Sequence, residues 1–114
     1  MVRIFIIYGN KEGERAGEKV NDYFKKNGLD SFLAAPKSPD IRIGEYFDKV
    51  INPELREANV VVVIGTPGLS YSRIARGEIS LAKVLNKRFV PCVRGKTKLP
   101  LDLDKMWFGS STFH

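Results

Sequence analysis

The apolar pattern of the chain is strongest at residues 60–64, where five β-branched residues follow one another. A run that is so short and apolar on both faces is typical of a central strand in a parallel sheet covered on both sides. Pro67 and Gly68 indicate a loop behind this strand, and Ser72 or a neighbouring residue can cap a helix after the loop. The pattern therefore predicts a strand, a loop and a helix in succession.

The rest of the chain alternates in the same way. We expect strands at residues 2–8, 30–35, 60–64, 88–93 and 106–108, and helices at 14–27, 44–51 and after Ser72. Gly28 stands where the first helix needs a left-handed residue at its end. Pro53 either interrupts the second helix or begins a further turn. Inward-facing positions are expected at Ala16, Val20, Tyr23, Phe24 and Asn27 in the first helix, and at Phe47, Val50 and Ile51 in the second.

This alternation predicts an α/β fold of three layers, a flavodoxin-like open parallel sheet of about five strands covered by helices on both faces. Right-handed crossovers bring the loops that follow the strands to one edge, where ligands bind in such sheets. These loops are residues 9–11, 35–43 and 66–72. We expect residues 1–114 to form a single domain, which could have been excised from a longer protein because no closing helix is apparent.

One acidic residue interrupts the apolar face of the helix after Ser72. At about 100° per residue, Glu78 falls in the middle of the apolar arc. An ionised carboxylate is costly to desolvate without a partner, so Glu78 is either paired inside the protein or lines a cleft where burial raises its pKa. The other polar side chains of this segment fall on the opposite, solvent side: Arg73, Arg76, Ser80, Lys83 and Lys87.

Composition narrows the chemistry. The chain is 43% hydrophobic and 28% charged, which is ordinary for a soluble globular domain. Its net charge is +6, and the basic residues are interspersed with acidic ones, so we expect no specific nucleic-acid binding. A phosphate-bearing small ligand would nevertheless be attracted by the positive charge. Residues 4–8 are too short a run for a signal or membrane segment, and we expect a cytoplasmic protein without membrane attachment.

Cys92 is the single cysteine and His114 the single histidine. They exclude an intramolecular disulfide, a Cys-rich metal site and a His-based catalytic triad within one chain. We therefore expect no metal and no bound cofactor.

The first strand and helix resemble those of flavodoxin. The flavodoxin phosphate loop is a run of Ser and Thr hydroxyls with Gly, whereas residues 10–14 (NKEGE) offer no hydroxyl and two carboxylates that would repel a phosphate. An FMN protein is therefore a remote alternative. A phosphoacceptor receiver domain would need paired acids after the first strand, where Tyr8, Gly9 and Asn10 stand.

A second resemblance covers nearly the whole chain. RIFIIY resembles the first strand of Toll/interleukin-1 receptor (TIR) domains, especially of their prokaryotic and archaeal branch. GEYFDKVINPELREANVVVVIGTPGLSYS is similar to the second helix, central strand and loop of that family, and LPLDLDKMWF to its closing region. RIARGEISLAKVLNKRFVPCV resembles its third helix and fourth strand, in which a Glu followed by an aliphatic residue, here Glu78 and Ile79, is the hallmark.

The resemblance implies an activity. Many TIR domains cleave NAD⁺ at the nicotinamide–ribose bond in defence or stress signalling, and tend to be active when they self-associate. The catalytic Glu of the family maps onto Glu78, which would hold the ribose hydroxyls and stabilise an oxocarbenium-like transition state. NAD⁺ would be the substrate rather than a cofactor. Substrate-binding positions of the family map onto Tyr8, Gly9, Asn10, Gly44, Ser72 and Ile74.

Two positions depart from the family pattern. Ile74 stands where a Trp is often found four residues before the Glu, which removes an aromatic stacking surface. Gly9 and Asn10 stand where a polar or basic pair is often found after the first strand.

Two other functions fit the same residues. A non-enzymatic TIR module that binds another TIR domain or a nucleotide signal would use residues 35–43 as a contact surface and Glu78 as a structural residue. A nucleoside deoxyribosyltransferase-like enzyme also has a Glu on a similar scaffold. The enzyme hypotheses need Glu78 for turnover, whereas the module needs it at most for stability.

Overall fold

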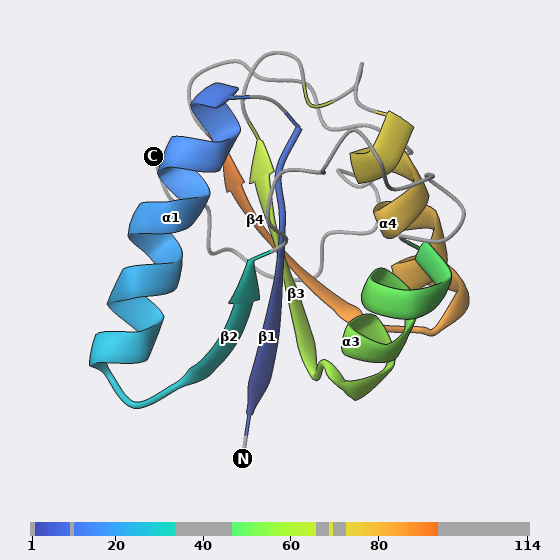
Figure 1. Cartoon of the computed structure of the whole chain (residues 1–114), viewed down its shortest axis with the longest axis horizontal. Coiled ribbons are helices and arrows are strands. Elements are labelled where there is room, and N and C mark those ends of the chain that lie inside the picture. Colours follow the sequence, from blue (N-terminus) through green and yellow to red (C-terminus); the bar gives the residue numbers. More distant parts are fainter. Residues whose placement is uncertain (1, 10, 34–46, 66–68, 70–72, 94–114) are drawn as a thin grey trace.

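The computed structural model describes residues 2–9, 11–33, 47–65, 69 and 73–93. Within these residues, four parallel strands form one sheet in the order β2-β1-β3-β4 (Figure 1). The strands are β1 (Arg3–Ile7), β2 (Asp30–Leu33), β3 (Val60–Gly65) and β4 (Arg88–Val93). The helices are α1 (Lys11–Lys26), α3 (Asn52–Glu57), which follows a π-helical turn (Phe47–Ile51), and α4 (Arg73–Val84).

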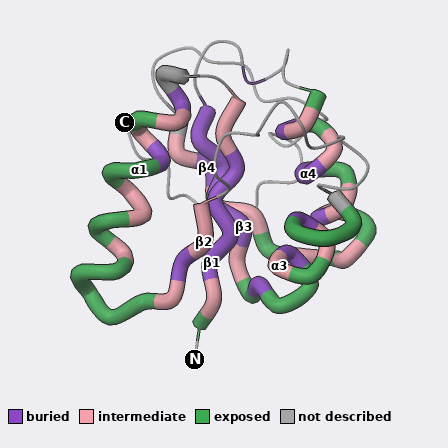
Figure 2. The backbone as a smooth tube through the Cα atoms, viewed as in Figure 1, coloured by how far each residue is buried: buried purple, intermediate pink, exposed green. Residues whose placement is uncertain are grey.

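Strands β1 and β3 are apolar on both faces, and helices cover both. Their odd-numbered residues pack with α3 and α4, and their even-numbered residues pack with α1 (Figures 1 and 2). We call the first group the α4-side core: Phe5, Ile7, Ile51, Leu55, Ala58, Val61, Val63, Leu69, Ala75, Ile79 and Ala82. The second group, the α1-side core, consists of Ile4, Ile6, Val62 and Ile64 with half-buried side chains around them. The predicted three-layer α/β fold is confirmed, while the expected fifth strand at residues 106–108 lies outside the described residues.

The strand order reverses direction between β1 and β3. The chain passes from β1 outward to β2, then returns to place β3 on the other side of β1 and β4 beyond it. The carboxyl ends of β1 and β3 therefore form the switch point at which open α/β sheets bind ligands. Tyr8 and Gly9 follow β1 at this point, and Gly65 is the last residue of β3.

Helix α1 differs from its prediction at its start and in its inward face. It begins at Lys11 rather than at residue 14, and Tyr23 is 65% exposed, so the predicted inward position of Tyr23 is wrong. Asn27 is likewise exposed beyond the end of the helix. Ala16, Val20 and Phe24 pack inward as expected. The position of Gly17 accounts for the changed inward face. A Cβ atom at Gly17 would lie 3.0 Å from Leu33 Cδ1, so the sheet approaches the helix on the side where Gly17 lies.

The second helical segment confirms one prediction at Pro53 and corrects another at Val50. Pro53 lies in the first turn of α3, which begins at Asn52, and it does not break the helix because proline is tolerated in a first turn. Ile51 and Leu55 are fully buried, but Val50 is 37% exposed, because the π-helical turn before α3 changes which side chains face the sheet. Residues 44–46 and the Phe47 side chain lie outside the description.

The prediction that the Lys87 side chain points to solvent is wrong. Helix α4 ends at Val84, and Asn86 then takes a left-handed conformation (φ 59°) that turns the chain toward β4. This turn brings Lys87 Nζ to the end of α3, where it donates hydrogen bonds to the carbonyl oxygens of Arg56 (2.8 Å) and Ala58 (2.7 Å). The last carbonyls of a helix have no partner within it, so Lys87 satisfies groups that would otherwise need water.

We predict that Lys87→Met lowers the free energy of unfolding by about 1–2 kcal/mol, because two charge-assisted hydrogen bonds to α3 are lost while the aliphatic stem remains. Lys19→Met, at an exposed position of α1, is the control and should change stability by less than about 0.5 kcal/mol. Urea unfolding followed by circular dichroism measures both. Equal stability of the two variants would contradict the role assigned to Lys87.

Candidate functional site

Glu78 is the sixth residue of α4 and is only 3% exposed. The residues that share its side of the helix, Ala75, Ile79 and Ala82, are fully buried in the α4-side core. The predicted position of Glu78 on the inward face is therefore confirmed. Its chemical role stays a prediction.

The environment of Glu78 differs from that of the other buried polar side chain in the described residues. Ser31 is buried beneath α1, and its hydroxyl bonds the side-chain oxygen of Asn21. In Glu78 the Oε2 atom is buried and accepts no hydrogen bond from the described part of the chain, although the residue takes part in another interaction. Placing a carboxylate in such a position costs free energy that a surface acid would not cost.

Glu78 lies halfway along α4, a helix that starts toward the carboxyl edge of the sheet. The helix contacts β1, and its first turn lies toward the end of the molecule at which the strand arrows point (Figure 1). At 1.5 Å per residue, Glu78 is about 8 Å along the helix from Arg73. The carboxyl edge of the sheet is also where the switch point between β1 and β3 lies.

The structure places only some of the predicted site residues together. Ile74 is half-buried one turn before Glu78, on the same side of α4. Tyr8 and Gly9 follow β1 at the switch point, but the Tyr8 side chain packs against the α1-side core, on the opposite face of the sheet from α4. Asn10, Gly44 and Ser72 lie outside the described residues.

The described residues contain no group of three or more His, Cys, Asp or Glu side chains that could hold a metal ion. In the same part of the chain, each helix is too short or too polar to cross a bilayer.

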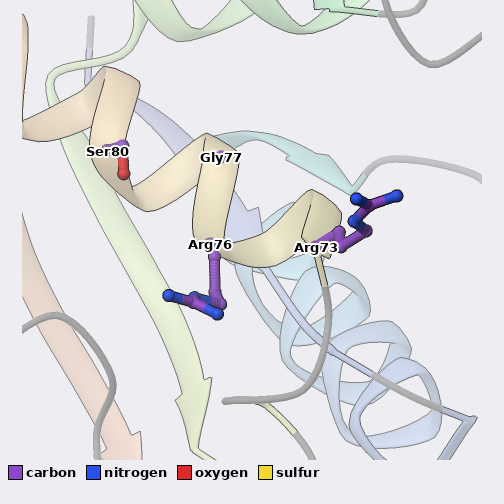
Figure 3. Close-up of a pocket in the computed structure, with 4 residues that line it drawn as sticks. All are labelled: Arg73, Arg76, Gly77 and Ser80. Atoms are coloured by element: carbon purple, nitrogen blue, oxygen red, sulfur yellow. The ribbon is translucent and has the colours of Figure 1, made fainter.

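The outer face of α4, which the sequence pattern places toward solvent, carries a hollow. An open hollow of about 280 Å³ is lined by Arg73, Arg76, Gly77 and Ser80 (Figure 3). The signal was present in the sequence, because these four residues recur at i, i+3, i+4 and i+7 and so share one side of a helix.

No protein-family model matches the sequence, and no curated protein matches it. Among solved structures, the chain resembles the TIR domain of the Toll-related receptor TRR-2 from Hydra magnipapillata, with a TM-score of 0.70 and 16% identity over 92% of this chain and 80% of that one. It also resembles the CMP N-glycosidase BcmB from Clostridium botulinum, with a TM-score of 0.51 and 18% identity over 80% of this chain and 71% of that one. At these identities the likeness defines the fold: the chain is an α/β protein with a TIR-like fold.

Cys92 lies in β4, paired with Ile64 near the carboxyl edge of the sheet. It is half-buried, and desolvation of the thiolate raises the pKa of its thiol to about 11.

We predict that Cys92 reacts with iodoacetamide at pH 8 about a hundredfold more slowly in the folded protein than in urea, since so little thiolate is present. Mass spectrometry of samples quenched over time measures the two rates. The folded rate should rise steeply between pH 8 and pH 10. A folded rate at pH 8 within a factor of a few of the unfolded rate would show that the thiol is not desolvated.

Proposed function

We propose that the chain hydrolyses an N-glycosidic bond of a nucleotide, with NAD⁺ as substrate and Glu78 as the catalytic carboxylate. One observation carries the proposal: an acidic side chain is buried on the sheet-facing side of α4, a helix that starts toward the edge at which open α/β sheets bind ligands. The likeness of the fold to a TIR domain and to a nucleotide N-glycosidase supports it.

A carboxylate in this position suits the chemistry. When the bond between ribose C1′ and the base nitrogen breaks, the bonding electrons leave with the base and positive charge develops on the ribose. A negative charge in a low-dielectric site stabilises that charge more than water does. Water then attacks C1′ and loses a proton, which gives ADP-ribose when NAD⁺ is the substrate.

The chemistry of the leaving group favours NAD⁺ over CMP as the substrate. Nicotinamide is a cation in NAD⁺ and departs as a neutral molecule, so no general acid is needed. Cytosine departs from CMP as an anion unless an acid protonates it. Cleavage of CMP therefore requires a second ionisable group in the site as the general acid. Within the described residues, Glu78 is the one buried acidic side chain.

Self-association through TIR–TIR contacts belongs to the same proposal. The TIR-like fold supports it, and it would make nicotinamide release rise more steeply than in proportion to protein concentration.

A non-enzymatic interaction module is the second candidate. The observation that favours it is the 3% exposure of Glu78 together with the interaction that the residue already makes, as expected of an acid that holds α4 in place. The two functions differ in what Glu78 is needed for.

We predict that Glu78→Gln lowers nicotinamide release from NAD⁺ at least about a hundredfold, because it removes the negative charge while keeping the size of the side chain. Glu18→Gln, at an exposed position of α1, is the matched control and should keep full activity. The assay is chromatography of nicotinamide and ADP-ribose, at high protein concentration with a crowding agent. Circular dichroism melts of all three proteins establish that they are folded.

Each pattern of results has a distinct meaning. Cleavage of NAD⁺ by the wild type and by Glu18→Gln, but not by folded Glu78→Gln, supports the proposal. Cleavage of CMP with the same dependence on Glu78, and none of NAD⁺, would keep the N-glycosidase and replace the substrate. Equal cleavage of NAD⁺ by Glu78→Gln would contradict the assigned role, and no cleavage of either nucleotide by the folded wild type would favour the interaction module.

A further inference from the structure

We propose that the first half of α4 opens locally to admit the nucleotide to Glu78, and that the buried side chain of Leu69 holds this half closed. The need for an opening rests on the proposed function, because a carboxylate that stabilises charge on a ribose must contact that ribose. Glu78 is only 3% exposed, and its helix neighbours Ala75 and Ile79 are fully buried. The described conformation is therefore the closed state of the proposed enzyme.

The first half of α4 has a sequence that stabilises a helix poorly. Arg73 and Arg76 lie in the first turn, where the positive end of the helix dipole disfavours cations, and this turn contains no acidic residue. Gly77 follows in the helix interior, where it loses more backbone entropy than alanine would. Gly77 lines the hollow on the outer face of α4 (Figure 3), so packing against the α4-side core does not explain the glycine. Residues 73–77 therefore depend on tertiary contacts to remain helical.

The second half of α4 is held more firmly. Ile79 and Ala82 are fully buried in the α4-side core. Just beyond the helix, the Lys87 amide donates a 3.0 Å hydrogen bond to the Ala82 carbonyl oxygen, and Lys87 Nζ binds the end of α3. An opening that begins at Arg73 is therefore expected to end near Glu78, the residue that it exposes.

Leu69 is the contact that closes the first half of the helix. It lies four residues after the end of β3 at Gly65 and four residues before the start of α4 at Arg73. Four residues span at most about 14 Å, so Leu69 lies near the carboxyl edge of the sheet. Its side chain is nevertheless fully buried and belongs to the same core as Ala75 and Ile79. Burial of this leucine therefore holds the start of α4 against the sheet.

Such an opening sets the rate of the proposed reaction. The observed rate of cleavage is the rate of the open form multiplied by the fraction of molecules that are open. A substitution that favours opening therefore raises cleavage, and one that favours the closed helix lowers it.

The test is chemical labelling of Glu78 in the full chain with a water-soluble carbodiimide and glycine ethyl ester, followed over time by mass spectrometry. These reagents convert an accessible carboxyl group to an amide, so the labelling rate reports the exposure of Glu78 whether or not the protein cleaves NAD⁺. Leu69→Ala should raise this rate at least about tenfold, because it removes a side chain that only the closed state buries. Gly77→Ala should lower the rate about two- to fivefold, because alanine favours the helix. Gly77→Ala keeps the test decisive even where Leu69→Ala fails to fold.

Two matched controls act outside α4. Leu55→Ala removes an equally buried leucine of the α4-side core from α3, and Asp22→Ala favours the helix at an exposed position of α1. Both variants should label Glu78 within about a factor of two of the wild-type rate, because neither changes the opening of α4. The exposed Asp48 should label at the same rate in every variant and so calibrates the reagent.

The outcomes separate an opening of α4 from a general loss of stability. Equal acceleration by Leu69→Ala and Leu55→Ala, or undiminished labelling of Gly77→Ala, would overturn the proposal. Labelling of wild-type Glu78 only at urea concentrations that unfold the whole chain would overturn it as well.

The same variants separate the opening from the proposed function. Where nicotinamide is released from NAD⁺, its rate should rise with the labelling rate, from Gly77→Ala through the wild type to Leu69→Ala. A release rate that is independent of labelling would overturn the role of the opening in admitting the nucleotide. The expected labelling pattern without nicotinamide release would support the opening and contradict the glycosidase.

Discussion

Strands β1 and β3 have no polar face, and the architecture depends on that constraint. A parallel pair that is apolar on both sides must be covered on both sides, which places α1 against the even-numbered residues and α3 and α4 against the odd-numbered ones. The inward side of α4 is therefore built from small and aliphatic residues. Glu78 lies in the middle of that side, so the packing that forms the core also buries its carboxylate.

The two edges of the sheet are built differently. At the amino edge, Arg3 Nε bonds Asp30 Oδ2 at 2.7 Å, and the Arg3 backbone exchanges hydrogen bonds with Asn59. These contacts tie the beginnings of β1, β2 and β3 together. The carboxyl edge holds the switch point between β1 and β3 and the start of α4. The contacts at the amino edge fix the strands, and the carboxyl edge is the one at which open α/β sheets bind ligands.

The layers and the inward position of Glu78 could be predicted from the sequence because they follow from periodicity. The residues whose predicted positions are wrong depend on how the helices pack against the sheet and against one another, and periodicity carries no information on this packing. Tyr23 is exposed because the sheet approaches α1 at Gly17, and Val50 because a π-helical turn precedes α3. The helix pattern continued past Val84 places Lys87 in solvent, but Asn86 turns the chain toward β4 and the Lys87 side chain then reaches α3. Charge on the outer face of α4 was visible in the sequence, but its hollow was not.

The proposed reaction requires Glu78 to lie beside the bond that is broken. A crystal structure of the Glu78→Gln variant with NAD⁺ tests this most directly, because a variant that cannot turn over keeps its substrate. We expect the nicotinamide ribose at the carboxyl edge of the sheet, with its C1′ atom within about 3.5 Å of the Gln side chain that replaces Glu78. NAD⁺ bound elsewhere with this side chain still enclosed in the core, or crystals at saturating NAD⁺ without bound nucleotide, would contradict it.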